Sequence, residues 1–97
     1  MSKPPAYIDN AKVLFWAWSG EKPFYAIKFT DGRHAHDIYG LAVCRYEKTN
    51  SVYRFSCDAN WETQGDTDCD TVEDAKGNGL IDFGLGSVEW REFSGEM

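Results

Sequence analysis

The sequence predicts an α+β fold, a small single domain in which a four to five stranded antiparallel meander sheet carries one short helix. Two observations predict it. Apolar residues recur with a period of two from about residue 11 to Trp61, which is the spacing of β-strands. Beyond Trp61 this period gives way to an acidic, turn-rich stretch with a single helix signal before Gly77. A chain of 97 residues has the length of one domain.

The ordered part of the chain is expected to begin near Ala11. Residues 1–10 contain adjacent prolines and predict an irregular arm, so the domain is expected over residues 11–97. From Val13 to Trp18 both faces of the first expected strand are apolar, which is typical of a strand covered on two sides. Regular alternation places Val13, Phe15 and Ala17 on one face and Leu14, Trp16 and Trp18 on the other.

Two hairpins are expected to follow. Asp31-Gly32 supplies the two positive-φ residues of a type I′ loop, which would set Ile27 opposite His36. Gly40 marks a bulge or bend. Thr49-Asn50 is the second two-residue loop, and it would set Cys44 opposite Phe55 and Arg45 opposite Arg54, a pairing of like charges.

One short helix is expected before Gly77. Asp70 or Thr71 can cap its first turn, and Glu73 or Asp74 would then complete a capping box. Closing strands are expected at residues 80–83 and 88–93, with a C-terminal strand that rejoins the sheet.

Two segments of the C-terminal half carry a resemblance. Tyr53-Arg-Phe-Ser-Cys-Asp58 with Trp61-Glu62, followed by Asp70-Thr-Val-Glu-Asp-Ala-Lys76, is similar to small bacterial proteins of the integron gene cassette and mobile-element type. Those proteins show a YRF-x-C-D-x-x-W-E segment followed by a D-S/T-V-E-x-A-K segment. The match covers about 25 of the 97 residues. The resemblance implies a compact α+β bacterial protein that can oligomerise, and it brings no activity or catalytic residue.

Charge divides the chain into two unequal parts. Residues 1–57 carry eight Lys or Arg against five Asp or Glu, net +3, whereas residues 58–97 carry two against eleven, net −9. Such a segment attracts basic protein surfaces and repels nucleic-acid phosphates. We therefore expect a non-enzymatic interaction protein, of the inhibitor or immunity kind, that engages a basic protein and no nucleic acid. The candidate partner-binding residues are Glu62, Asp66, Asp68, Asp70, Glu73 and Asp74.

Aromatic residues are the second functional signal. Fifteen aromatics exceed what a core of this size usually holds, so some are expected to line a pocket or an interface. The alternative function is a small-molecule-binding domain or small enzyme whose aromatic pocket is walled by Trp16, Trp18, Tyr25 and His36. A homodimer would bury the same surplus of aromatic side chains, in an interface centred on Trp16, Trp18 and Trp90. The candidates for pocket or interface are Trp16, Trp18, Tyr25, His34, His36 and Trp90.

No metal motif in the sequence is complete. Asp66-x-Asp68-x-Asp70 alternates carboxylates as calcium loops do, but an EF-hand needs Gly and Glu where Thr71 and Gly77 stand. We therefore interpret these three aspartates as part of an exposed acidic loop that leads into the helix. His34 and His36 share a strand face, although no CxxC or HxxxH spacing supplies further zinc ligands. We expect no metal and no cofactor.

None of the three cysteines is expected to be a catalytic nucleophile. A nucleophilic thiol at Cys69, before the helix start, would be opposed by the surrounding acids, and Cys44 and Cys57 lie within apolar strands. An odd number of cysteines without an export signal predicts reduced thiols and a cytoplasmic location. No apolar run approaches 18 residues, so no membrane span is expected.

Overall fold

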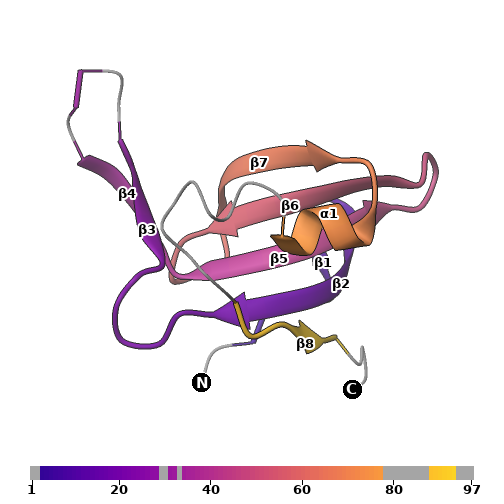
Figure 1. Cartoon of the computed structure of the whole chain (residues 1–97), viewed down its shortest axis with the longest axis horizontal. Coiled ribbons are helices and arrows are strands. Elements are labelled where there is room, and N and C mark those ends of the chain that lie inside the picture. The colour runs from indigo at the N-terminus through magenta and orange to yellow at the C-terminus, as the bar shows by residue number, and fades with distance from the viewer. Residues whose placement is uncertain (1–2, 29–30, 33, 78–87, 94–97) are drawn as a thin grey trace.

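The fold is seen in a computed structural model, which describes residues 3–28, 31–32, 34–77 and 88–93. Within these ranges lie eight strands and one helix, which confirms a small domain built mostly of antiparallel sheet with one short helix (Figure 1). In chain order they are β1 (Tyr7–Ile8), β2 (Ala11–Trp18), β3 (Tyr25–Lys28), β4 (His34–Ile38), β5 (Gly40–Tyr46), β6 (Ser51–Cys57), β7 (Thr63–Cys69), α1 (Val72–Gly77) and β8 (Arg91–Glu92).

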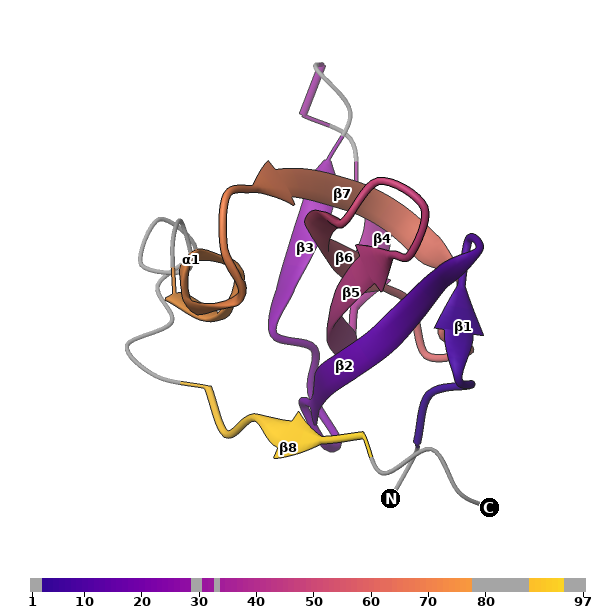
Figure 2. The same cartoon turned by 90° about the vertical axis from the view of Figure 1, so that its right-hand side faces the viewer.

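The main sheet has the strand order β1-β2-β5-β6-β7, and β8 pairs with β2 beside β1. The sequence neighbours β3 and β4 do not join it. They form a separate two-stranded hairpin that projects from the body of the molecule (Figure 1). The sheet is therefore not an uninterrupted meander, because a hairpin is inserted between two strands that pair with each other. The main sheet is strongly curled, and its first strand bends toward its last (Figure 2).

A bulge at Leu14 sets which residues of β2 face the core. Val13 pairs with Cys44 and Phe15 with Val43, so Leu14 is an extra residue with no partner on β5. Regular alternation predicted Val13 and Trp16 on opposite faces, and this is wrong, because the extra residue reverses the alternation. Both side chains belong to the same buried cluster.

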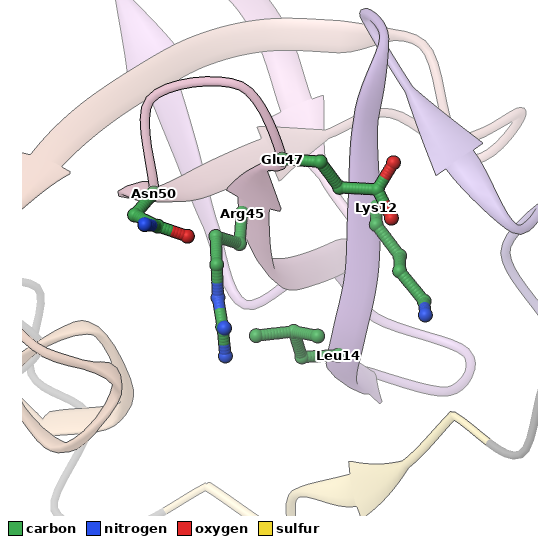
Figure 3. Close-up of a pocket in the computed structure, with 5 residues that line it drawn as sticks. All are labelled: Lys12, Leu14, Arg45, Glu47 and Asn50. Carbon is green, nitrogen blue, oxygen red and sulfur yellow. The ribbon is translucent and has the colours of Figure 1, made fainter.

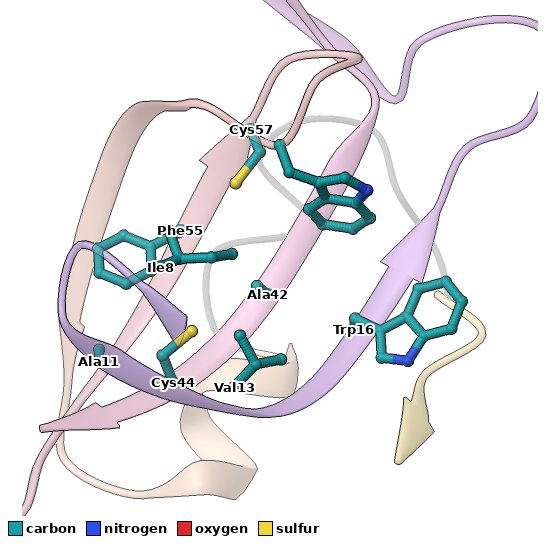
Figure 4. Close-up of a cluster of buried hydrophobic side chains, with 9 residues drawn as sticks. Ile8, Ala11, Val13, Trp16, Ala42, Cys44, Phe55 and Cys57 are labelled. Carbon is teal, nitrogen blue, oxygen red and sulfur yellow. The ribbon is translucent and has the colours of Figure 1, made fainter. Parts of the chain in front are cut away.

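The concave side of the sheet, here called the inner face, holds the larger core. Its cluster combines β1, β2, β5, β6 and the loop after β6, and Figure 4 shows Ile8 of β1 lying against Phe55 of β6. The loop after β6 contacts β5 at Gly40, where a Cβ atom would lie 2.5 Å from the Trp61 ring. The ring therefore packs directly on the backbone of β5. The buried members are Ile8, Ala11, Val13, Trp16, Ala42, Cys44, Phe55, Cys57 and Trp61.

The opposite side, here called the helix face, is covered by α1 and by the β3–β4 hairpin. Under α1 lie Val43 and Val52, and under the hairpin lies Leu41. Polar contacts fix both covers. Arg54 Nη1 donates a hydrogen bond to the Ala75 carbonyl at 3.2 Å, and Tyr25 and Ser56 share a hydrogen bond between their hydroxyls. The helix face is therefore covered by elements that polar contacts hold in place, whereas the inner face is covered by an apolar cluster.

Two local expectations were wrong. Residues 7 and 8 are not part of an irregular arm, because Asp9 and Asn10 both have positive φ and close a tight turn that pairs Ile8 with Ala11. The β5–β6 loop is longer than Thr49-Asn50, since Tyr46 pairs with Ser51.

The longer loop shifts the β5–β6 register by two residues, so Cys44 faces Tyr53 instead of Phe55. A shift of two keeps every side chain on its expected face. The predicted pairing of Arg45 with Arg54 does not form, because Arg54 pairs with Val43.

In the other hairpin Ile27 does pair with His36, as expected, but an irregularity sets Lys28 against His34. The predicted closing strand at 80–83 lies outside the described residues. Arg91–Glu92 forms the expected C-terminal strand that rejoins the sheet. Among the described residues there is no helix with the length and apolarity needed to cross a membrane.

Candidate partner-binding surface

The acidic residues follow the edge of the main sheet. Thr63–Cys69 was expected as a loop, but it forms β7, which pairs with β6. Tertiary pairing outweighs the poor strand propensity of its Gly and Asp residues. Asp66 and Asp68 are exposed on this strand, two positions apart and therefore on one face. Charged residues are the usual means of keeping an edge strand from pairing with other chains, so β7 has a structural reason to be acidic.

The β6–β7 register places these two carboxylates beside aromatic rings. Asp66 pairs with Phe55 and Asp68 with Tyr53, so acids and rings share the inner face. The rings of Tyr53 and Phe55 are stacked with centroids 6.1 Å apart, and Tyr46 meets Tyr53 edge-on at 5.5 Å. The half-buried tyrosines thus form a corner whose border is acidic.

The electrostatics of Tyr46 reflect this border. Burial and then the carboxylate of Asp9, with smaller contributions from Tyr53 and Asp66, raise the pKa of the Tyr46 hydroxyl above its usual range. Negative charge from the β1–β2 turn and from β7 therefore converges on one ring. A cation placed here would meet both a ring and a carboxylate.

The remaining predicted acids lie at the two ends of β7. Glu62 precedes the strand and is exposed, and Asp70 and Glu73 follow it and are exposed. Asp74 is half-buried, and its backbone amide donates a hydrogen bond of 3.1 Å to Thr71 Oγ1. This bond identifies Thr71 as the helix cap, one of the two residues predicted for it.

The predicted aromatic pocket is not assembled as one wall. Trp16 and Trp18 lie on the inner face, where both pack near Trp61, at centroid distances of 6.2 and 5.7 Å. Tyr25 and Trp90 lie on the helix face, the first bonded to Ser56 and the second donating from Nε1 to the Lys76 carbonyl at 3.0 Å. The sheet separates the two pairs.

The same separation bears on the expected homodimer. Trp16 is only 6% exposed, and Trp90 packs on the other face of the sheet, so the three tryptophans do not form one surface. The homodimer itself stays a prediction.

The histidines lie on the projecting hairpin. His36 is exposed and pairs with Ile27, while the side chain of His34 is outside the part of the chain that the structure describes. Within the described part there is no group of three or more His, Cys, Asp or Glu placed to hold a metal ion.

The three thiols are free and weakly acidic. Burial raises the pKa of Cys57 to about 12 and raises the pKa of Cys44 further. Burial also raises the pKa of the half-buried Cys69, against the opposing effect of Arg54. A raised pKa leaves little thiolate near neutral pH, so none of the three is activated as a nucleophile.

Sequence reasoning did not identify the tyrosine corner. The expected Thr49-Asn50 loop, which set Cys44 opposite Phe55, also sets Tyr46 directly opposite Tyr53. Only the observed β6–β7 register places Tyr53 beside Asp68. The alternation of Asp66 and Asp68 was a usable signal, because alternating residues of a strand share a face.

Comparison with protein family models, with curated proteins and with solved structures finds no match to this chain.

Proposed function

We propose that this protein is a non-enzymatic binding protein, of the inhibitor or immunity kind, that engages a basic protein partner through β7 and the start of α1. The observation that carries the proposal is the β6–β7 register, which places the exposed Asp66 and Asp68 on the same face as the half-buried ring of Tyr53. Lys and Arg side chains carry both a positive head and an apolar stem, and such a surface contacts each part.

The charge distribution supports a basic partner. The segment from residue 58 onward carries net −9, and the acids of β7 and its two ends gather much of that charge in one region. Complementary charge accelerates association and makes it dependent on salt. The resemblance to proteins of bacterial gene cassettes is compatible with a small partner-specific protein, and a homodimer is part of the same proposal.

A matched pair of variants tests the surface. Asp66→Asn with Asp68→Asn removes two charges beside the tyrosine corner, whereas Glu21→Gln with Glu89→Gln removes two exposed charges elsewhere. The partner is first captured from a lysate of the source cell with the natural protein, identified by mass spectrometry and purified. Its affinity for each variant is then measured by calorimetry.

We expect the β7 pair to lower the affinity by about tenfold or more and the control pair to change it less than about threefold, since each desolvated charge contact contributes one to several kcal/mol and remote charges little. The captured protein should be basic, and its affinity should fall as salt is raised. Equal affinity for the natural protein and the β7 pair would reject the proposal.

A further inference from the structure

Two positive side chains face each other across β2 and β5. Lys12 and Arg45 are partners in the strand register, so their side chains leave the sheet on the same side. Like charges placed directly opposite each other in a sheet are destabilising. Both residues are exposed, and among the described residues neither side chain closes an ion pair or donates a hydrogen bond. The repulsion is therefore not relieved within this part of the chain.

The pair borders a hollow of about 260 Å³ on the helix face, at the end of the sheet away from the β3–β4 hairpin. Figure 3 shows the Lys12 and Arg45 ends extending to the same side, with Leu14 between them. Leu14 reaches this position because it is the bulged residue of β2. The remaining lining residues are Glu47 and Asn50.

We propose that this hollow binds a small organic carboxylate. The guanidinium of Arg45 offers a planar pair of donors that matches a carboxylate, and Lys12 adds a second positive charge. Leu14 offers an apolar contact for the hydrocarbon part of the ligand, and the Asn50 side chain adds amide donors.

Charge and size both favour this class of ligand. Lys12, Arg45 and Glu47 together carry net +1, which a monovalent carboxylate balances and a phosphate dianion exceeds. The Glu47 carboxylate lies away from the two cationic ends in Figure 3, so it lowers the total charge without occupying the space between them. The volume is slightly below the range of roughly 300 to 1,000 Å³ for drug-sized ligands, so a ligand of a few carbon atoms fits.

The site is separate from the proposed partner surface. Its lining residues lie on β2, on β5 and in the turn after β5, with none on β7 or α1, and the tyrosine corner lies on the opposite, inner face of β5 and β6. Binding at one surface can therefore be measured while the other is left intact.

Titration with sodium isovalerate, followed by amide chemical shifts and compared with sodium chloride at equal ionic strength, tests the proposal. We expect saturable shifts at Lys12, Leu14, Arg45 and Asn50, with a dissociation constant on the order of millimolar. Shifts that grow linearly, or equally with chloride, would overturn it. Tighter binding of inorganic phosphate than of isovalerate would overturn the choice of carboxylate.

Variants sharpen the same titration. Arg45→Met keeps the apolar stem and should weaken binding about tenfold or more, because charged hydrogen bonds are lost. Lys48→Met removes the same charge from the neighbouring turn, outside the hollow, and should stay within about twofold of the natural protein. Glu47→Gln should strengthen binding about twofold to fivefold. Equal weakening by Arg45→Met and Lys48→Met would reject the site in favour of general electrostatics.

A measurement without ligand checks that the variants fold and tests the premise. Because Lys12→Met removes one of two facing charges, its urea midpoint should equal or exceed that of the natural protein. Added isovalerate should raise the midpoint of the natural protein more than that of Arg45→Met. A lower midpoint for Lys12→Met would show that the two charges do not repel each other, and the argument for an anion would fail.

Discussion

The two faces of the main sheet are held by different physical means. On the inner face, Trp61 packs its ring on the backbone of Gly40, and the cluster around it is made of apolar side chains and two thiols. On the helix face, α1 is only six residues long and is held by directed contacts. Arg54 and Trp90 donate to the carbonyls of Ala75 and Lys76 near its C-terminal end.

The difference shows how so short a helix can be part of a stable fold. An isolated helix of six residues does not form in water, because nucleation is unfavourable and the end groups lack partners. Here Arg54 of β6 and Trp90, just before β8, supply such partners, and Lys76 adds a contact of 3.6 Å from its Nζ to the centroid of the Phe15 ring. The inner face should respond to changes of side-chain volume, whereas the helix face should respond to the loss of single polar contacts.

The largest expected effect is that of Gly40→Ala. A Cβ at this position would meet three ring atoms of Trp61 between 2.5 and 2.8 Å, and the ring is enclosed by the core. Overpacking of this kind costs about 3 kcal/mol, the upper part of its usual range. Urea unfolding followed by Trp fluorescence measures it.

The control for Gly40→Ala comes from the other face. In Gly65→Ala the added Cβ lies 3.3 Å from Ile27 Cδ1, the end of a flexible side chain. We expect a change within about 1 kcal/mol, because Ala also removes the entropic cost of Gly in a strand. Similar losses for both variants would remove the distinction between the faces.

The second largest expected effect is a loss of folding stability at alkaline pH, caused by the buried Cys57 thiol of the inner face. Burial raises the pKa of Cys57 to about 12, so the native thiol stays protonated where the unfolded one, with a pKa near 9, ionises. The stability it contributes is complete below about pH 9 and is lost as the pH rises toward 12, at about 1.4 kcal/mol per pH unit.

Unfolding midpoints of Cys57→Ala between pH 8 and pH 10 check this effect. The variant starts less stable, but its further loss with pH should be smaller than that of the natural protein, since only Cys44 then remains as a buried thiol with a strongly raised pKa. An identical pH dependence of the unfolding midpoint in both proteins would show that the Cys57 thiol does not cause the loss of stability.

The smallest expected effect concerns the helix cap. Thr71→Ala removes the acceptor of the Asp74 amide and should cost about 1 kcal/mol. Asp70→Ala, one residue earlier, serves as the control and should cost about 0.5 kcal/mol or less, because the cap is the Thr71 hydroxyl. Equal costs for the two variants would place the cap elsewhere.

The sequence predicted local structure well where residues close together in the chain determine it, as at a helix cap or in the alternation of a strand. The helix cap was expected at Asp70 or Thr71 and is Thr71, and the faces of β5 and β6 follow from alternation, which a register shift of two leaves unchanged. The strand Arg91–Glu92 was expected within a longer closing segment.

Features that depend on distant partners were not predictable. The bulge at Leu14 has no local signal, because Leu14 is apolar like its neighbours, and it is seen only in the pairing of β2 with β5. β7 contains Gly and two aspartates, and only pairing with β6 makes it a strand. The acids of the candidate surface were predicted individually, but the tyrosine corner beside them depends on that pairing.

The bulge also gives β2 a tolerance of deletion that strands rarely show. Leu14 has no partner on β5, so the strand holds one residue more than this pairing uses. Deleting Leu14 would join Val13 directly to Phe15, restore regular alternation and leave both Val13 and Trp16 on the inner face. Tolerance of insertions and deletions, usually a matter of loops, is in this protein decided in the middle of a strand.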